Sequence, residues 1–452
     1  LLPYGVYTVH QTKGWEGREK IKDFDVYINT DMKEYKFLIN NSNFESYIKV
    51  VKLDTETGKQ IAYEGAGFEI YDSNGHRVNM QFTYPEVTSI HTFYTNSEGS
   101  LITPEKLPYG DYSLVEVQAP YGYVLDKTPI PFTVTQENSS TDTGVTVVKV
   151  KARDVAQKGV IEITKTGEIF SSVAMLGGGY IDENGNDVEF PITYSPIYET
   201  RNLANAVFQI YAAEDITLGN GVTYWHKDEA IETLTSDWDA VMSQDLLVGK
   251  YYYVESSDLH GYVTDTQKHY FEIEDNQSTE IQLVESTLEN KRPTVEVKFT
   301  KYMESLKDHE ELNAYQDVIF GIYAREDIYD YMGNVAIPYG TLIDTTGIDE
   351  LGQFDHFPDL PNGVYYVKEL QTNKMYNLDE TEYDFEIAWH SGDVSRYTIN
   401  IGSDEGIVNE LQRGKVIIHK TDLDTKEALK DVEFVMSTDK DFTHIVDTVK
   451  TD

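Results

Sequence analysis

Short runs of alternating hydrophobic and polar residues dominate the chain. The clearest run is a turn followed by an alternating segment, and its four copies lie at 2–11, 107–116, 248–255 and 360–369. A period of two residues places successive side chains on opposite faces of a β-strand. Turn residues recur at short intervals and long amphipathic helical stretches are few, so the pattern predicts an all-β fold.

Two other runs repeat along the chain. The first is an apolar, strand-like segment whose copies are 206–216 and 318–328, with weaker versions at 67–71 and 432–436. The second is a β-branched run that ends in lysine, with copies at 48–52, 160–165, 297–301 and 416–420. We expect each copy of the second run to form the first strand of a module, since self-similarity of this kind is typical of tandem arrays.

The repeats divide the chain into a tandem array of β-sandwich modules. Complete modules are predicted at 46–154, 155–290 and 291–409. Residues 1–45 match the C-terminal half of a module, and residues 410–452 match the N-terminal half of another. A half-sandwich has open sheet edges and an exposed apolar face, so neither half should be stable alone. We therefore expect this segment to belong to a longer array.

The middle module is the longest because extra residues lie between Lys165 and Val207. The glycines Gly177–Gly179 and the polar run Asp182–Asp187 predict turns in this stretch. We interpret it as a surface insertion. The polar run lacks the ligand spacing of a calcium loop, so a simple turn is the favoured interpretation.

Composition narrows the class of protein. A chain of 452 residues is too long to fold around a single hydrophobic core of ordinary size, so about three to four domains are expected. The absence of cysteine excludes disulfides, thiolate metal sites and a cysteine nucleophile. With 37 basic and 78 acidic residues the net charge is -41, so nucleic acid is not expected as a partner. No stretch approaches the roughly twenty apolar residues of a membrane span, so we expect no membrane insertion in this segment. We also expect no metal and no cofactor.

A constant spacing connects the lysines to side-chain carbonyl groups. The residue 11 positions before each lysine that ends a β-branched run is Asn or Asp, namely Asn41, Asp154, Asn290 and Asn409. Each complete module also has a glutamate in its alternating segment. The resulting triads are Lys52, Glu116 and Asp154; Lys165, Glu255 and Asn290; and Lys301, Glu369 and Asn409. Lys49 and Lys298 compete for the lysine role, but they break the spacing and face the opposite way.

These three residue types suit the formation of an amide bond inside a sandwich. First and last strands can lie side by side, so residues far apart in sequence can meet in the core. Burial disfavours the ammonium form of lysine and keeps a nearby glutamic acid protonated. The glutamic acid can then polarise the Asn or Asp carbonyl and pass protons between the amine and the leaving group. Ammonia would leave from Asn, and water from Asp.

Two stretches of the first complete module are specific enough to compare with known families, namely residues 51–54 with 57–59 and the glutamate-bearing stretch 112–123. Through them the sequence resembles the CnaB, or SpaA-type prealbumin-like, Ig-like modules of Gram-positive surface adhesins and pilins. In that family the matching Lys, Glu and Asn or Asp form an intramolecular isopeptide bond, with the glutamate as the catalytic group. The resemblance therefore implies this role for each triad. In the N-terminal half-module Gln11 replaces the glutamate, so a slow or absent bond is expected there.

Taken together, these features predict the stalk or fibre shaft of a bacterial cell-surface adhesin, outside the cell, with further modules or neighbouring subunits as partners. Enzyme activity on an external substrate is not expected, since no nucleophile motif or phosphate loop occurs. Alternatives are a sortase-assembled pilus subunit, or a module that binds a host protein or glycan, either through the insertion or at a tip outside this segment. A further hypothesis is that successive chains complete each other, with Lys420 of one facing Asn41 of the next.

Overall fold

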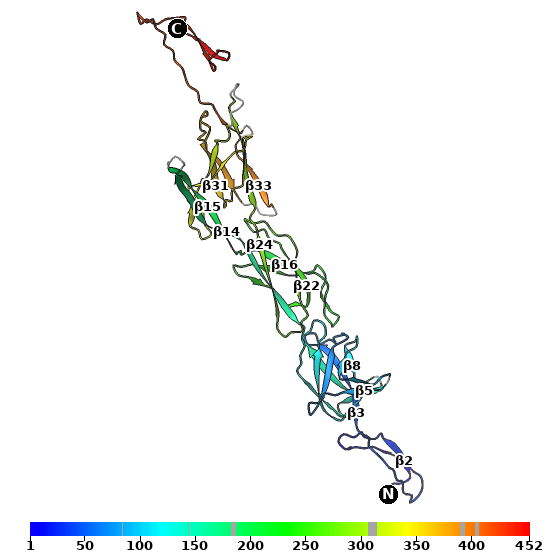
Figure 1. Cartoon of the computed structure of the whole chain (residues 1–452). Helices are drawn as coiled ribbons and strands as arrows, with labels where there is room; N and C mark the ends of the chain where they lie inside the picture. Colours follow the sequence, from blue (N-terminus) through cyan, green and yellow to red (C-terminus); the bar gives the residue numbers. More distant parts are fainter. Residues whose placement is uncertain (84, 143, 182–186, 306–313, 389–393, 403–405) are drawn as a thin grey trace. The chain divides into compact units, whose positions relative to one another are not determined.

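The computed structural model describes the whole chain except residues 84, 143, 182–186, 306–313, 389–393 and 403–405. The described residues form strands and loops and contain no helix, which confirms the predicted all-β class (Figure 1). The chain divides into two compact units. The first is built on Leu1–Ile169 and Tyr198–Pro293, and the second on Phe170–Ile197, Thr294–Ala388 and Arg396–Asp452.

Module 1 is the name used here for strands β3 to β13. One sheet has the order β12-β13-β3-β8, with β9 also paired to β3, and the other has the order β11-β10-β4-β7. A small hairpin, β5-β6, completes it. The bounds are β3 Glu45–Asp54, β4 Gly67–Asp72, β5 Met80–Phe82, β6 Thr88–Ile90, β7 Thr92–Tyr94, β8 Ser100–Ile102, β9 Leu107–Pro108, β10 Gly110–Gln118, β11 Ile130–Val134, β12 Ser139–Asp142 and β13 Val145–Asp154.

Module 2 comprises strands β14 to β24. In one sheet β14 pairs with β15, β20, β21 and β24, and the other sheet has the order β19-β16-β22-β23. The strands β17 and β18 form a separate pair. The bounds are β14 Lys158–Ile181, β15 Asp187–Asn202, β16 Val207–Ala212, β17 Ile216–Thr217, β18 Thr223–Trp225, β19 Ala230–Thr235, β20 Val241–Met242, β21 Leu246–Leu247, β22 Gly249–Glu255, β23 His269–Ile273 and β24 Gln282–Asn290.

Module 3 comprises strands β25 to β34 and repeats the same plan. In one sheet β25 pairs with β30, β33 and β34, and the other sheet has the order β29-β26-β31-β32. The strands β27 and β28 form a separate pair. The bounds are β25 Thr294–Met303, β26 Ile319–Ala324, β27 Ile328–Tyr329, β28 Val335–Ile337, β29 Leu342–Gly347, β30 Gln353–His356, β31 Gly363–Gln371, β32 Tyr383–Ile387, β33 Arg396–Asn400 and β34 Ile407–Asn409.

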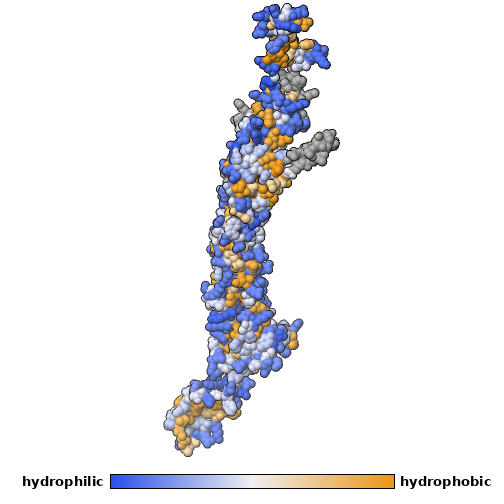
Figure 2. All heavy atoms as spheres, turned by 90° about the vertical axis from the view of Figure 1, so that its left-hand side faces the viewer, coloured by the Kyte–Doolittle hydropathy of each residue, from blue (hydrophilic) through white to orange (hydrophobic). Residues whose placement is uncertain are grey.

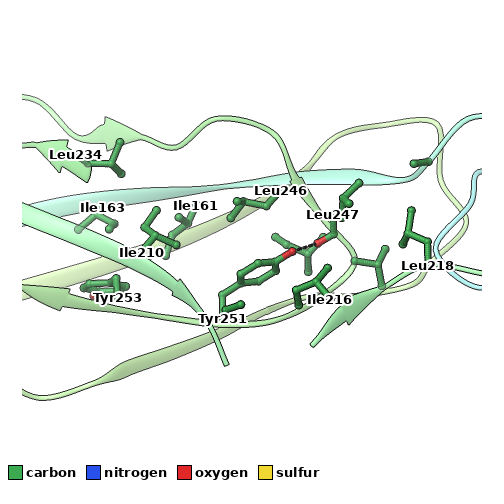
Figure 3. Packing of buried hydrophobic residues seen from close by; sticks show 14 of the residues in the cluster. Ile161, Ile163, Ile210, Ile216, Leu218, Leu234, Leu246, Leu247, Tyr251 and Tyr253 are labelled. Atoms are coloured by element: carbon green, nitrogen blue, oxygen red, sulfur yellow. Dashed lines mark hydrogen bonds between the residues drawn. The ribbon is translucent and has the colours of Figure 1, made fainter. Parts of the chain in front are cut away.

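The core of each module lies between its two sheets and follows from the alternation in the sequence. In β3, every second residue from Ser46 to Asp54 is buried, as the period of two requires. Figure 3 shows the equivalent packing in module 2, where Ile161 and Ile163 of β14 face Ile210 of β16 and Tyr253 of β22. Polar residues cover much of the face drawn in Figure 2, with smaller apolar areas between them.

The first and last strands of each module are parallel neighbours in one sheet. The pairs are β3 with β13, β14 with β24, and β25 with both β33 and β34, and β14 and β24 are labelled close together in Figure 1. A parallel pair needs a long connection between its strands, and here the rest of the module supplies it. This topology brings the two ends of every module together in space.

Two expectations about local structure are wrong. Gly177–Gly179 lie within β14 rather than in a turn, because pairing with β15 gives their backbone a hydrogen-bonded partner that offsets the low strand propensity of glycine. The polar run Asp182–Asp187 lies outside the described residues, apart from Asp187, the first residue of β15. The insertion thus lengthens the first strand of module 2 and adds a second strand beside it.

The second wrong expectation concerns the run 416–420, which is not a strand. A strand needs a hydrogen-bonded neighbour, and none of the described strands pairs with this run. Val416 and Ile417 are each 65% exposed, so the apolar face that would enter a core is uncovered. The terminal segments instead contain one antiparallel pair each: β1 Gly5–Val9 with β2 Phe24–Ile28, and β35 Glu433–Ser437 with β36 Ile445–Lys450.

Candidate functional site

Parallel pairing of the terminal strands brings each predicted lysine close to its acceptor. In every module the acceptor lies two residues beyond the residue that pairs with the lysine. The paired residues are Lys52 with Ala152, Lys165 with Leu288, and Lys301 with Ile407. Residues two apart in a strand point to the same face. The lysine and the acceptor therefore both enter the core of their module.

The glutamate of each triad comes from the other sheet. It lies on the strand formed by the alternating segment of the module, directly opposite a phenylalanine of the neighbouring antiparallel strand. The pairs are Glu116 with Phe68, Glu255 with Phe208, and Glu369 with Phe320. The structure thus assembles all three triads from three different strands each. None of the nine residues exposes more than 4% of its surface, so water contributes little to their solvation.

In module 1 the lysine lies between two carboxyl groups. Lys52 Nζ donates to Glu116 Oε1 at 2.7 Å and also to Asp154 Oδ1. Asp154 Oδ2 has no hydrogen-bond partner among the described residues. Burial raises the pKa of Glu116 to about 8 and also raises the pKa of Asp154. Two carboxyl groups beside one amine in an apolar core therefore retain a proton near neutral pH.

In module 2 the glutamate is the centre of the hydrogen bonding. Asn290 Nδ2 donates to Glu255 Oε2 at 2.8 Å and to Oε1 at 3.0 Å, and Lys165 Nζ donates to Glu255 Oε2 at 3.1 Å. The carbonyl oxygen of Asn290 has no partner among the described residues. Burial lowers the pKa of Lys165 against the opposing effect of Glu255, which favours the neutral amine that a nucleophile requires.

Module 3 has the most complete arrangement. Lys301 Nζ donates to Asn409 Oδ1 at 2.7 Å and lies 3.5 Å from Glu369 Oε1. Asn409 Nδ2 donates to both carboxyl oxygens of Glu369, each at 2.9 Å. Burial lowers the pKa of Lys301, as it does for Lys165. The amine, the amide carbonyl and the carboxyl group are in mutual contact, which is the proximity that acyl transfer requires.

Sequence reasoning did not assign the phenylalanine opposite each glutamate. Lys52 Nζ lies 5.2 Å from the centre of the Phe68 ring, and Lys301 Nζ lies 5.6 Å from that of Phe320. Both rings are fully buried. The signal was present in the apolar repeat that contains these residues, but a core aromatic residue is the ordinary interpretation of such a position. Its place beside the amine shows that it also helps to exclude water from the triad.

The half-module residues lie apart from any complete triad. Gln11 Oε1 accepts hydrogen bonds from Asn41 Nδ2 at 3.1 Å and from the backbone N–H of Ile21 at 3.0 Å. Gln11 thus contacts the Asn that follows it, as the glutamates do in modules 2 and 3. Lys420 is exposed, and its backbone carbonyl accepts from the N–H of Leu429. Pairing of Lys420 with Asn41 remains a prediction.

In the described part of the chain, no group of three or more histidine, aspartate or glutamate side chains is arranged to hold a metal ion. Across the same residues, no helix has the length and apolarity to cross a bilayer.

Three segments of the chain match one protein-family model, that of the SpaA prealbumin-like fold domain. They are residues 46–149, 196–287 and 302–401. Each segment falls inside one predicted module, and together they cover more than half of the chain. The comparison with curated proteins gives no match.

Several solved structures are similar to this chain at low sequence identity. The Bacillus anthracis TIE protein is 22% identical with a TM-score of 0.44, and the match covers 88% of this chain and 58% of that one. BcpA, the major pilin subunit of Bacillus cereus, is 14% identical with a TM-score of 0.32, covering 81% and 100%. The shaft pilin SpaA from Lactobacillus rhamnosus GG is 14% identical with a TM-score of 0.20, covering 55% and 98%. The chain spans less than two thirds of the TIE protein structure.

Proposed function

The chain belongs to the family of SpaA prealbumin-like fold domains, and from this premise we propose that it is a stalk or fibre-shaft segment of a bacterial cell-surface adhesin or pilus. Each complete module closes itself by an autocatalytic isopeptide bond between its first and last strands. The observation that carries the proposal is the burial of a lysine, a glutamate and an Asn or Asp that are linked by hydrogen bonds in all three modules. The proposed location is the outside of the cell, and the proposed partners are further modules or subunits.

The reaction follows from the contacts in module 3. A proton moves from the Lys301 ammonium to Glu369, which leaves a neutral amine and a carboxylic acid. Lys301 Nζ attacks Cγ of Asn409, and its remaining excess proton passes through Glu369 to Nδ2. The bond between Cγ and Nδ2 then breaks and ammonia departs. One amide bond is formed and one is broken, and Glu369 keeps the proton that it first took from the Lys301 ammonium.

Burial supplies the driving force for this chemistry. An unreacted triad holds ionisable groups in a core where their charged forms are poorly solvated. Desolvation lowers the pKa of Lys165 and Lys301 and raises that of Glu116, so folding itself produces the reactive protonation states. Closure removes the lysine amine from this penalty, and in module 1 it also removes the Asp154 carboxyl group. The same core therefore activates the residues and stabilises their product.

Intact mass tests the proposal directly. Modules 2 and 3 should each lose one ammonia, and module 1 should lose one water because Asp154 is the acceptor. The folded chain is therefore expected to be lighter than its sequence by two ammonia and one water. Proteolysis and tandem mass spectrometry should then recover the branched peptides that join Lys52 to Asp154, Lys165 to Asn290 and Lys301 to Asn409. A folded chain with the unmodified mass would disprove the chemistry.

Closure of module 1 should depend on pH through the protonation of its glutamate. Its reactive form has Glu116 protonated, and burial raises the pKa of Glu116 to about 8. The acid form thus predominates below that pH and is lost above it, so the rate of Lys52–Asp154 closure should fall as pH rises through about 8.

The measurement uses chain isolated unfolded in denaturant and then refolded at values from about pH 6 to about pH 10. Samples quenched over time give the amount of each branched peptide. Closure of modules 2 and 3 in the same samples shows whether the chain has folded. A rate for module 1 that stays constant or increases through pH 8 would contradict the assignment of Glu116 as the proton donor.

A further inference from the structure

Module 3 contains a fourth polar side chain in contact with its triad. Thr372 lies three residues after Glu369, and its Oγ1 accepts a hydrogen bond from Asn409 Nδ2 at 2.7 Å. The same nitrogen donates to Glu369, while the carbonyl oxygen of Asn409 accepts from Lys301 Nζ at 2.7 Å. Every polar atom of the Asn409 amide is therefore engaged. The amide is held with its oxygen toward the amine and its nitrogen toward Thr372 and Glu369.

Module 2 provides a natural comparison, because it has the same acceptor without the threonine. The residue three positions after Glu255 is Asp258, which accepts from the Thr264 hydroxyl instead. Asn290 Nδ2 is bonded to Glu255 alone, and its carbonyl oxygen has no partner among the described residues. Lys165 accordingly contacts Glu255 rather than the amide oxygen. In module 1 the position is Ala119, and the acceptor Asp154 has no amide nitrogen to hold.

The contact lies on an atom that must change in the proposed reaction. Asn409 Nδ2 leaves as ammonia after it receives one proton through Glu369 and its bond to Cγ breaks. An amide nitrogen has two hydrogens. If one is directed to Thr372, the nitrogen stays close to the Glu369 carboxyl that must protonate it, and the carbonyl stays turned toward Lys301.

We propose that Thr372 is a further catalytic residue of module 3, one that orients the Asn409 amide and accepts a hydrogen bond from the departing nitrogen. This inference rests on the proposed function, since it concerns the rate of the same bond. Modules 1 and 2 lack the contact and close without it. Module 3 should accordingly close faster than module 2, which has the same leaving group.

The test compares Thr372→Val and Thr372→Ser in the full chain. Valine keeps the shape and removes the hydroxyl, and serine keeps the hydroxyl. Each chain is refolded from denaturant, and the branched peptides of the three modules are quantified over time. A net hydrogen bond of about 1 kcal/mol corresponds to roughly a fivefold change in rate. We expect Thr372→Val to close module 3 about threefold to tenfold more slowly, and Thr372→Ser to restore most of the rate.

The other two modules are internal controls in every sample, and their rates should not change. Equal closure of module 3 in Thr372→Val and in the unaltered chain would overturn the inference. It would also be overturned if Thr372→Ser were as slow as Thr372→Val, because the methyl packing and not the hydroxyl would then matter. Failure of the proposed function looks different: the unaltered chain itself would yield no peptide joining Lys301 to Asn409.

Discussion

Replacing Glu369 by Gln is expected to leave module 3 without its cross-link while modules 1 and 2 close normally. Glutamine has nearly the same size and can still contact Asn409, but it cannot take a proton from Lys301 and deliver it to the leaving nitrogen. Apart from the mass difference between glutamate and glutamine, the chain should be heavier than the unaltered protein by one ammonia. The peptide joining Lys301 to Asn409 should be absent, and the other two branched peptides should remain.

The unlinked module should also lose much of its stability. The proposed bond would join residues 108 apart in sequence, and a cross-link that closes a loop of about 100 residues stabilises a fold by about 4 to 5 kcal/mol through the entropy of the unfolded chain. The buried amine left in the core adds to the loss. Limited proteolysis should therefore cut the variant within module 3 under conditions that leave the unaltered chain intact.

Glu386→Gln is the matched control, because Glu386 lies on β32 of the same module with its side chain exposed. It makes the same chemical change away from the triad, and it should preserve both the mass loss and the resistance to protease. A Glu369→Gln chain that still forms the bond would show that the proton transfer uses another group. The proposed role of Glu369 in the closure of module 3 would then be wrong.

The strand plan and the membership of the triads could be predicted from the sequence because both leave periodic signals. Alternation of period two marks the strands, and the constant spacing between an Asn or Asp and the next lysine marks the junctions between modules. The structure adds the register: the acceptor is offset by two residues from the partner of the lysine in each parallel pair. That offset depends on how two distant strands align, which local pattern does not encode.

Other features could not be predicted because they depend on what a segment pairs with or contacts. Gly177–Gly179 have a turn-like composition but lie in β14 beside β15. The run 416–420 has a strand-like composition but has no pairing strand among the described residues. Thr372 is not repeated at the matching positions of modules 1 and 2, which hold Ala119 and Asp258, and only the fold places its hydroxyl 2.7 Å from Asn409. Tertiary context decided each of these cases.

The position of the cross-link determines which part of a module would carry tension. In module 3 the chain enters along β25, reaches Lys301, and would pass through the bond to Asn409, the last residue of β34. Tension along the chain would thus run through the first part of β25 and the bond, and then leave the module. Residues 302–408 lie between the two linked positions and would carry no load. A stalk built in this way resists extension through a covalent bond rather than through its hydrogen bonds.

Pulling the full chain by its two ends should reveal this difference as a change in length. In the unaltered protein, residues 302–408 should never extend, whatever force is reached before a covalent bond breaks. In Glu369→Gln, unfolding of module 3 should release the 108-residue separation between Lys301 and Asn409, which is about 350 Å at roughly 3.3 Å per residue. Single-molecule force spectroscopy should record one such step in Glu369→Gln and none in Glu386→Gln. If the unaltered chain also lengthened by this step, module 3 could not be closed by the proposed bond.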